Sequence, residues 1–369
     1  MVELNRRALI QLSLAGMLTA TASPALAATS LKNGIDISWL PNYESAGGKF
    51  YTAAGKPTTV FDLMKLSGVR VVRIRVFVNP NYRNGKLSDA IALASRAKDA
   101  GLDVCLDLHF SDDWADPGHQ QTPAGWSTTN IDVLAGQVQS YVARTLTEFK
   151  NRSIPLAYVQ LGNEISNGML WPLGRIDGNN SVQWKNLAKI FNAATSALRQ
   201  IMPSAKNLLH LDCSGDSNRL RWWLMNASYY WIRDYNIVGL SYYPQWHGGL
   251  KSLTETLEVV AWEFEKPVIL AETAYPYTWS TFGNDVINPA KSVLPGYPLT
   301  ASGQANYLKK LNTIMKGLSY GNGLGVWWWE GMVPRVLANG QVIWDSGMTN
   351  STLVDETGKA LAALAAMKG

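Results

Sequence analysis

The sequence has 369 residues, of which 47% are hydrophobic and 17% charged, and its formal net charge is +5 at pH 7. This composition is typical of a globular protein with a substantial core. Lysine and arginine are scattered along the chain without forming a run, so the small positive charge predicts no nucleic-acid partner. Several of the 15 tryptophans, including Trp114, Trp126 and Trp246, lie in polar or Pro/Gly-rich stretches typical of loops. Aromatic rings exposed in loops indicate a flat ligand with an apolar face, such as a sugar.

Residues 1–27 have the features of a secretory signal peptide. Arg6 and Arg7 precede an apolar run over residues 8–22, and small residues follow at Ala25 and Ala27. The run is too short and too rich in Ala, Ser and Thr for a membrane-spanning helix. The arginine pair also resembles a twin-arginine signal. The mature chain, residues 28–369, is therefore expected to be secreted or periplasmic, with no membrane partner.

Apolar, β-branched runs alternate with amphipathic segments through the mature chain. The predicted strands are residues 34–40, 69–78, 102–110, 156–165, 207–214, 237–244, 267–273 and 324–330. The predicted helices are residues 58–66, 88–100, 131–151, 182–201, 219–233, 253–264, 302–318 and 359–367. Strands that alternate with helices imply parallel pairing through right-handed crossovers.

Eight such units predict an α/β fold, a closed (β/α)8 TIM barrel in a single domain. An open doubly wound sheet is the competing architecture. It is disfavoured because the first turn, from Trp39 to Asn42, lacks the Gly-rich phosphate loop of a dinucleotide site.

The two cysteines, Cys105 and Cys213, are expected to remain free. Each lies in a predicted strand, and these are the third and fifth strands of the barrel. A strand between them separates the two by roughly two spacings of about 4.8 Å. This exceeds the Cα separation of about 7 Å beyond which a disulfide cannot form.

Polar residues gather where the predicted strands end, which is where a TIM barrel has its active site. The strand ends carry, in chain order, Asp36 and Trp39; Arg73, Arg75 and Asn79; Asp107, His109, Asp112, Asp113 and Trp114; Asn163 and Glu164; Ser241, Tyr242 and Tyr243; Glu272; and Trp329 and Glu330. By comparison, the turns that precede the strands carry only residues that end helices, such as glycine.

Glu164 and Glu272 end the fourth and seventh strands, so they face each other across the mouth of the predicted barrel. Paired carboxylates hydrolyse glycosidic bonds, one as the acid that protonates the leaving oxygen and the other as the nucleophile. The acid must hold its proton near neutral pH and the nucleophile must not. Arg73 and Tyr243 could keep Glu272 ionised. Arg75 shares the strand face of Arg73, so either arginine could take that role.

The chain resembles the glycoside hydrolases of clan A, and specifically family 53, the arabinogalactan endo-β-1,4-galactanases. The resemblance rests on Gly34-Ile35-Asp36-Ile37-Ser38, on the stretch from Arg73 to Pro80, on Gly162-Asn163-Glu164 and on Ser241-Tyr242-Tyr243-Pro244. The longest match is Asp107-Leu108-His109-Phe110-Ser111-Asp112-Asp113-Trp114-Ala115-Asp116-Pro117-Gly118-His119-Gln120.

This resemblance implies a retaining endo-hydrolase of β-1,4-galactan, the side chain of type I arabinogalactan in pectin. It implies Glu164 as acid/base and Glu272 as nucleophile. The implied substrate-binding residues are Arg73, His109, Asp112, Trp114, Asn163, Tyr243 and Trp329. Among them Asn163 would bind the sugar 2-hydroxyl, and Trp329 would lie under the sugar that is attacked.

No cofactor and no metal are predicted. Some bacterial relatives hold calcium in the last loops, and Asp285, Asp345 and Asn350 are candidate oxygen ligands here, but the chain lacks a compact Asp-x-Asp-x-Asp loop. The expected partner is a plant cell-wall polysaccharide, and the protein is expected to act as a monomer.

Three alternatives remain open or are disfavoured. Another clan A endo-glycanase would act on mannan, xylan or β-glucan. A catalytically inactive carbohydrate-binding barrel would not need both carboxylates. An aldolase-type barrel would need a Schiff-base lysine at a strand end, and none is seen.

Overall fold

The computed structural model describes residues 30–80, 85–283 and 285–369. The predicted signal peptide lies outside these residues. Among the residues that are described, no helix is both long and apolar enough to cross a membrane.

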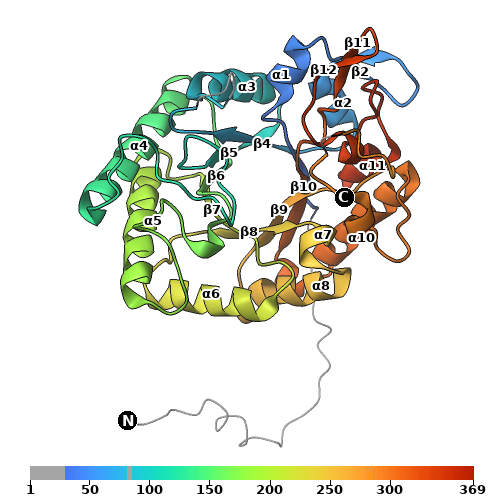
Figure 1. The fold of residues 1–369 in the computed structure, drawn as a ribbon. Helices are drawn as coiled ribbons and strands as arrows, with labels where there is room; N and C mark the ends of the chain where they lie inside the picture. The colour runs from blue at the N-terminus through green and yellow to red at the C-terminus, as the bar shows by residue number, and fades with distance from the viewer. Residues whose placement is uncertain (1–29, 81–84, 284) are drawn as a thin grey trace, which may run out of the picture.

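Eight parallel strands close into a barrel at the centre of the molecule, as predicted (Figure 1). Their order around the ring is β1-β10-β9-β8-β7-β6-β5-β4. The strands are β1 (Gly34–Asp36), β4 (Val71–Val76), β5 (Asp103–Leu108), β6 (Tyr158–Leu161), β7 (Lys206–Leu211), β8 (Ile237–Tyr242), β9 (Val268–Thr273) and β10 (Gly323–Trp328). Each lies within its predicted range or exceeds it by one residue.

A ring of helices surrounds the barrel (Figure 1). They include α2 (Val60–Leu66), α3 (Leu87–Asp99), α4 (Ile131–Asn151), α5 (Ser181–Ile201), α6 (Ser217–Tyr229), α8 (Leu250–Glu258) with the π-helix η3 (Val259–Glu263), α10 (Ala301–Lys316) and α11 (Ala362–Ala365) with η6 (Ala366–Lys368). The predicted helices correspond to these. Side-chain caps fix several starts; the Asn130 side chain, for example, accepts the backbone N–H groups of Asp132 and Val133 at the start of α4.

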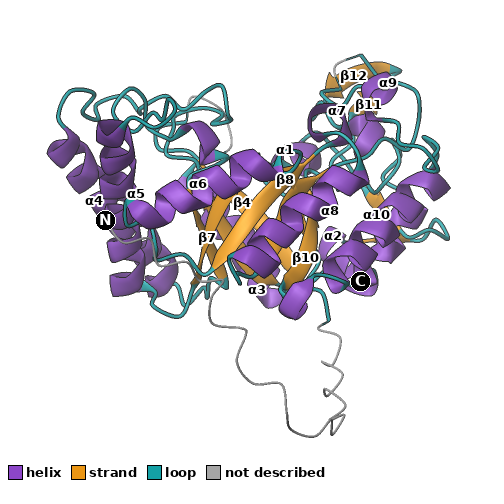
Figure 2. Cartoon of the chain, turned by 90° about the horizontal axis from the view of Figure 1, so that it is seen from below, coloured by secondary structure: helices purple, strands orange, loops and turns teal. Residues whose placement is uncertain are grey.

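Short elements that were not predicted lie in the connections. They are α1 (Leu40–Ser45), the hairpin β2 (Phe50–Tyr51) with β3 (Pro57–Thr58), η2 (Ile165–Asn167), α7 (Pro244–His247), α9 (Pro289–Ser292), η4 (Ser319–Gly321), the hairpin β11 (Val336–Ala338) with β12 (Gln341–Trp344), and η5 (Thr349–Ser351). Figure 2 shows α7, α9 and the β11–β12 hairpin beyond one end of the barrel. These segments therefore build up one rim of the barrel.

The interior of the barrel is filled by side chains from alternate strand residues, which stack in layers. One layer is apolar, and its cluster comprises Val71, Cys105, Tyr158, Leu208, Ile237, Ile269, Ala271 and Trp327. Two residues further along four of these strands come Arg73, Asp107, Gln160 and His210, all buried. The strands thus carry a polar layer directly above an apolar floor.

Cys105 and Cys213 are both free and buried, which confirms the prediction from strand order. Cys105 lies on β5 and Cys213 follows β7, with β6 paired between the two strands.

Gly162 allows β6 to turn sharply at its carboxyl end. Its φ is +91°, and a Cβ there would lie 2.8 Å from Ile165 Cγ2 and 3.0 Å from Met169 Sδ. Glycine takes such a conformation without steric cost, whereas other residues are strained.

Gly162→Ala is expected to lower the free energy of unfolding by about 1–3 kcal/mol, because it adds both backbone strain and close contacts. Denaturant unfolding measures this. Gly136→Ala is the matched control, since Gly136 lies inside α4 with open space around its Cβ. That control should stabilise the protein by about 0.5–1 kcal/mol. Equal effects of the two changes would contradict the account of Gly162.

Candidate active site

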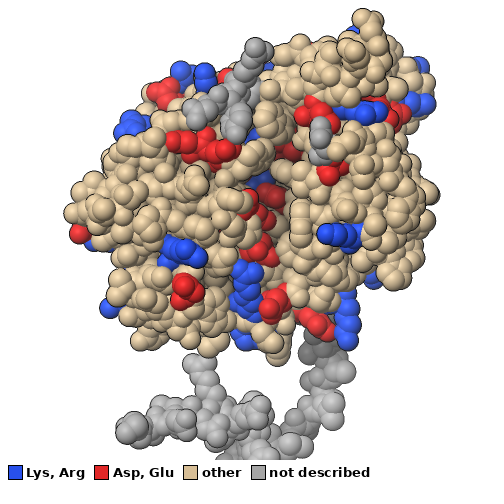
Figure 3. Space-filling model, in the orientation of Figure 1, with Lys and Arg blue, Asp and Glu red and all other residues tan. Residues whose placement is uncertain are grey.

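A cavity of about 890 Å³ opens over the carboxyl ends of the barrel strands. Viewed down the barrel, the molecule has a central hollow in which acidic side chains are visible (Figure 3). The predicted site residues that line it are Arg73, His109, Trp114, Asn163, Glu164, Tyr243, Glu272 and Trp329. Other lining residues include Trp39, Asp116, Asp212, Arg219, Trp246 and His247. The fold therefore brings residues from most of the chain into one cleft.

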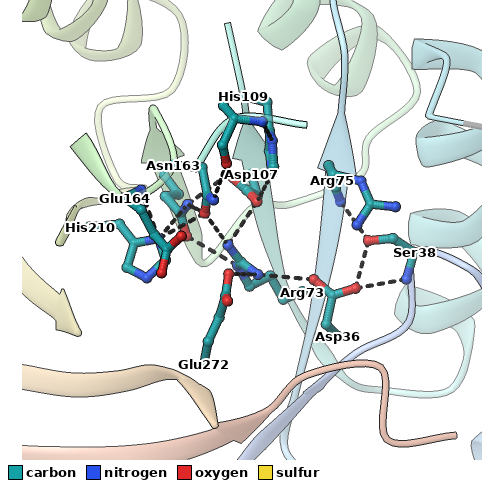
Figure 4. Close-up of polar contacts among 12 residues, drawn as sticks. Asp36, Ser38, Arg73, Arg75, Asp107, His109, Asn163, Glu164, His210 and Glu272 are labelled. Carbon is teal, nitrogen blue, oxygen red and sulfur yellow. Dashed lines mark hydrogen bonds and ion pairs between the residues drawn. The ribbon is translucent and has the colours of Figure 1, made fainter. Parts of the chain in front are cut away.

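Arg73, on β4, is the centre of the polar layer (Figure 4). Its Nε–H donates to Gln160 Oε1 at 3.1 Å, and Nη2 donates to Asn163 Oδ1 at 2.8 Å. Nη1 and Nη2 also form ion pairs with three carboxylates, namely Asp36 at 3.1 Å, Asp107 at 2.8 Å and Glu272 at 2.8 Å. A guanidinium has five N–H donors, and here it has five acceptors. The orientation of Arg73 is consequently fixed on all sides.

Glu272, on β9, receives two of the contacts expected from the sequence. Its Oε1 pairs with Arg73, and its Oε2 accepts the Tyr243 hydroxyl at 2.9 Å. Burial raises the pKa of Glu272, while the Arg73 charge and the Tyr243 hydrogen bond lower it. Burial and the charge of Glu272 raise the pKa of Tyr243 well above its usual range, so Tyr243 remains a neutral donor.

Glu164 lies between β6 and η2, with a left-handed φ of +48°. Burial and the neighbouring charge of Glu272 raise the pKa of Glu164 well above its usual range. Arg73 pairs directly with Glu272, so Glu272 is the carboxyl of the pair that ionises first. The site therefore holds one carboxyl suited to keep a proton and one suited to lose it.

Gln160 and His210 are buried members of the polar layer that the sequence prediction did not identify. Gln160 Nε2 donates to Asp107 Oδ1 at 2.7 Å. His210 Nδ1 lies 2.8 Å from Asn163 Oδ1, and its Nε2 lies 2.9 Å from Ser241 Oγ. A polar residue two positions after an inward apolar residue of a barrel strand was the available signal.

His109 follows β5 and is held through both ring nitrogens. The backbone N–H of Ala115 donates to His109 Nδ1 at 3.2 Å, so the ring proton is on Nε2, which lies 3.0 Å from Asp107 Oδ2. Burial lowers the pKa of His109, and this keeps the ring neutral. His109 therefore presents a fixed tautomer at the edge of the cavity.

Trp39, Trp114 and Trp329 form an aromatic wall on one side of the cavity. The Trp114 ring centroid lies 6.1 Å from each of the other two. Arg75 supports this wall from below, with its guanidinium carbon 4.0 Å from the Trp114 centroid. Of the two arginines left open by the sequence, Arg73 contacts Glu272 and Arg75 packs under the aromatic rings.

Asp112 has a different position from the one expected of a substrate-binding residue. Its Oδ1 accepts the backbone N–H of Asn79 at 2.9 Å, and its Oδ2 accepts that of Ala124 at 2.8 Å. It does not line the cavity. Both oxygens join two loops, so the structure places Asp112 among the residues that hold these loops together.

The candidate oxygen ligands of the last loops also bond to the protein itself. Asp345 Oδ1 accepts the backbone N–H of Gly347 at 2.9 Å, Asp285 Oδ1 accepts that of Asn350 at 3.3 Å, and Asn350 Nδ2 donates to the Ile287 carbonyl at 2.8 Å. Within the described ranges, no group of three or more His, Cys, Asp or Glu residues is arranged to hold a metal ion.

Glu330 is a third buried carboxyl near the site, at the end of β10. Arg75 Nη1 lies 3.5 Å from its Oε1, and the backbone N–H of Trp39 donates to its Oε2 at 3.4 Å. Burial and the charge of Asp36 raise the pKa of Glu330 well above its usual range, and Arg75 only partly opposes them.

Comparison with known proteins shows that nearly the whole chain is similar to one family of enzymes. Residues 32–367 match the family description Glycosyl hydrolase family 53. A probable arabinogalactan endo-beta-1,4-galactanase A of Aspergillus fumigatus is 34% identical over 318 residues, covering 83% of this chain and 85% of the fungal protein.

Two solved structures share the architecture at full length. One, from a study of two fungal beta-1,4-galactanases, is 30% identical with a TM-score of 0.80 and covers 92% of this chain and 99% of the other. The other is the family 53 catalytic domain of Ignisphaera aggregans, 26% identical with a TM-score of 0.83, covering 93% of this chain and 97% of that domain.

Glu330→Gln is expected to stabilise the protein at neutral pH. Because the folded pKa of Glu330 is raised above the ordinary value of 4.5, its contribution to stability is greatest below pH 4.5 and is lost as the pH rises. Glutamine mimics the protonated acid and has no such loss. Thermal unfolding should show no gain at pH 4 and a gain of about 2–5 °C at pH 7. A lower melting temperature at pH 7 would show instead that an ionised Glu330 stabilises the fold.

Proposed function

Because the chain belongs to glycosyl hydrolase family 53, we propose that it is an endo-β-1,4-galactanase with Glu164 as its acid/base and Glu272 as its nucleophile. The substrate is the β-1,4-galactan of type I arabinogalactan. The observation that carries the proposal is the pair of carboxyls in one open cleft, in which Arg73 and Tyr243 both contact Glu272 directly.

In the first step, Glu272 attacks the anomeric carbon of the sugar while Glu164 gives its proton to the leaving glycosidic oxygen. The bond from the anomeric carbon to that oxygen breaks, and a glycosyl ester forms on Glu272. Arg73 and Tyr243 hold one oxygen each of the Glu272 carboxylate. They therefore keep the nucleophile ionised and aimed before the sugar arrives.

In the second step, Glu164 is a carboxylate and takes a proton from water, which attacks the same carbon and releases Glu272. Two displacements at one carbon retain its configuration. Glu164 ends the cycle protonated, and the Glu272 charge opposes its ionisation again. The raised pKa of Glu164 thus serves both steps.

The remaining lining residues bind the substrate in this proposal. Asn163, which Arg73 and the Ala115 carbonyl hold in one orientation, would bond the 2-hydroxyl. Trp329 and Trp114 are nearly perpendicular to each other, with an interplanar angle of 83°, and offer rings on which successive sugars can stack. The His109 ring packs edge to face against Trp114, with ring centroids 6.2 Å apart.

A panel of polysaccharides separates the galactanase from the other clan A activities. Galactan should release reducing ends rapidly, whereas mannan, xylan and β-glucan should release few. Mannan cleavage without galactan cleavage would overturn the substrate assignment. Binding of galactan without any turnover would favour the inactive carbohydrate-binding barrel.

We also infer that the protein is exported, which the Arg6–Arg7 pair and the apolar run over residues 8–22 support. Amino-terminal sequencing of the protein recovered outside the cytoplasm tests this inference. The mature chain should begin at or near Ala28. A full-length chain confined to the cytoplasm would contradict export.

Glu272→Ala is expected to lower kcat on galactan by at least about 10³-fold, because no other group replaces the nucleophile. Azide added to this variant should occupy the vacated space and give a glycosyl azide of inverted configuration, which NMR identifies. Glu263→Gln, a change on the outer helix layer, is the control and should keep wild-type activity. Normal turnover by Glu272→Ala would refute the assignment.

Glu164→Ala is expected to fail on galactan but to keep the first step on aryl galactosides with acidic phenol leaving groups, which need no protonation. The covalent ester then accumulates, and a burst of phenol precedes a slow steady rate. Azide should speed that steady rate and give a glycosyl azide of retained configuration. A uniform loss of both steps on every substrate would contradict the acid/base role.

A further inference from the structure

The cavity includes a part of its wall to which the proposed mechanism gives no role. Trp246, Arg219 and Asp212 line this part. Asp212 directly follows β7, Arg219 lies near the start of α6, and Trp246 lies on α7, which follows β8. The Trp246 side chain is 56% exposed although it borders a cleft. These three residues all come from the segments that follow two neighbouring strands, β7 and β8.

The order of the strands divides the cleft into two halves. Around the ring, β8 and β7 separate β9, which carries Glu272, from β6, which precedes Glu164. In the other direction the same two strands are separated by β10, β1, β4 and β5. Figure 1 shows β7 and β8 below the centre of the ring and β4 and β5 above it. Trp329 and Trp114, which follow β10 and β5, belong to the second half. A glycosidic bond held between the two carboxyls therefore has one half of the cleft on each side.

Trp246 contacts the side of the cleft that carries the nucleophile. Its ring centroid lies 5.2 Å from that of Tyr243, and the two ring planes are nearly perpendicular, at 82°. The Tyr243 hydroxyl in turn donates to Glu272 Oε2 at 2.9 Å. Only one side chain therefore separates the Trp246 ring from the proposed nucleophile. An exposed ring at this distance can pack against the C–H face of a sugar next to the scissile bond.

Arg219 and Asp212 are fixed against the side of the cleft that carries the acid. Arg219 Nη2 donates to Asn167 Oδ1 at 3.0 Å. The backbone N–H of Asp212 donates to Ser166 Oγ at 3.0 Å. Asn167 and Ser166 belong to η2, which begins directly after Glu164. Arg219 Nη1 also pairs with Asp212 Oδ2 at 3.6 Å. A guanidinium has five N–H donors, so these two contacts leave donors for sugar hydroxyls.

The segments after β7 and β8 pack directly against each other at Gly215. A Cβ there would lie 2.4 Å from the carbonyl oxygen of His247, so only glycine allows this approach. His247 follows Trp246 in the sequence, and its Nδ1 accepts the backbone N–H of Tyr243 at 2.9 Å. The aromatic ring and the polar pair are therefore parts of one wall that is formed before substrate binds.

We propose that Trp246 and Arg219 bind the leaving sugar, the galactosyl unit on the reducing-end side of the bond that is cut. Its C–H face packs on the Trp246 ring, and its hydroxyls bond to Arg219 and Asp212. The proposal rests on the proposed function, in which Trp329 and Trp114 bind the attacked sugar and the one before it. Because those two rings lie in the other half of the cleft, the half with Trp246 receives the leaving part of the polysaccharide.

The experiment compares Trp246→Ala on two substrates, galactan and β-galactobiosyl fluoride. Fluoride leaves without a sugar attached, so the fluoride substrate occupies only the half of the cleft with Trp329 and Trp114. Trp246→Ala should lower kcat/KM on galactan by about threefold to tenfold, as expected for the loss of one ring contact. It should leave kcat/KM on the fluoride unchanged.

Two further tryptophan variants serve as controls. Trp262 lies on η3, is 60% exposed and does not line the cavity, so Trp262→Ala should leave both substrates unaffected. Trp114→Ala should lower kcat/KM on both substrates, because both place sugars in its half of the cleft. The pattern across the three variants therefore identifies which half binds the leaving sugar.

A second measurement is the transfer of the galactobiosyl group to added galactose during turnover of the fluoride. The 4-hydroxyl of galactose attacks the anomeric carbon of the glycosyl ester, Glu164 takes the hydroxyl proton, and Glu272 is released. Trp246→Ala and Arg219→Met should each lower the ratio of galactotriose to galactobiose by about threefold to tenfold, because galactose binds where the leaving sugar was. This ratio does not depend on how much of a variant is folded.

An equal loss of kcat/KM by Trp246→Ala on galactan and on the fluoride, or an unchanged transfer ratio, would overturn the proposal. The wild-type enzyme separates this failure from failure of the proposed function. If it cleaves galactan and Trp246→Ala behaves like Trp262→Ala, the function is right and the site for the leaving sugar is wrong. If it cleaves neither galactan nor the fluoride, the proposed function itself is wrong.

Discussion

The buried guanidinium of Arg73 is the interaction on which the site depends. It neutralises part of the charge of Asp36, Asp107 and Glu272, which come from three different strands. Each of these carboxylates would be costly to bury without a partner. One cation therefore both permits the acidic cluster and sets where its members lie. The barrel supplies the frame that makes this possible, since parallel strands present inward residues at matching heights.

The two carboxyls of the proposed mechanism differ through their surroundings rather than their chemistry. Glu272 has a cation and a phenol hydroxyl on its two oxygens. Glu164 has an anion for a neighbour and a strained backbone that turns it toward the cleft. Two glutamates thus have different roles, because Glu272 at the end of β9 contacts Arg73, whereas Glu164 after β6 faces the charge of Glu272.

Much of the fold and part of the site could be predicted from the sequence. Alternating strand and helix patterns predict parallel pairing, eight such units favour a closed barrel, and a barrel places Glu164 and Glu272 on one face. Periodicity could not choose between Arg73 and Arg75, because both point inward and only their heights differ. The sequence pattern did not identify His210, because a single polar residue in an apolar strand is most often a core residue whose hydrogen bonds are satisfied. The backbone partners of Asp112 could not be predicted, because they depend on tertiary contacts, which no local pattern encodes.

The apolar floor beneath the polar layer limits the route by which water can reach the site. Tyr158 and Trp327 pack edge to face within it, with ring centroids 5.4 Å apart, and close the barrel from below. Water that is to attack the glycosyl ester must therefore enter by the mouth through which the polysaccharide enters. The departing half of the polysaccharide occupies that mouth until it is released. Its release therefore precedes the arrival of water at the glycosyl ester.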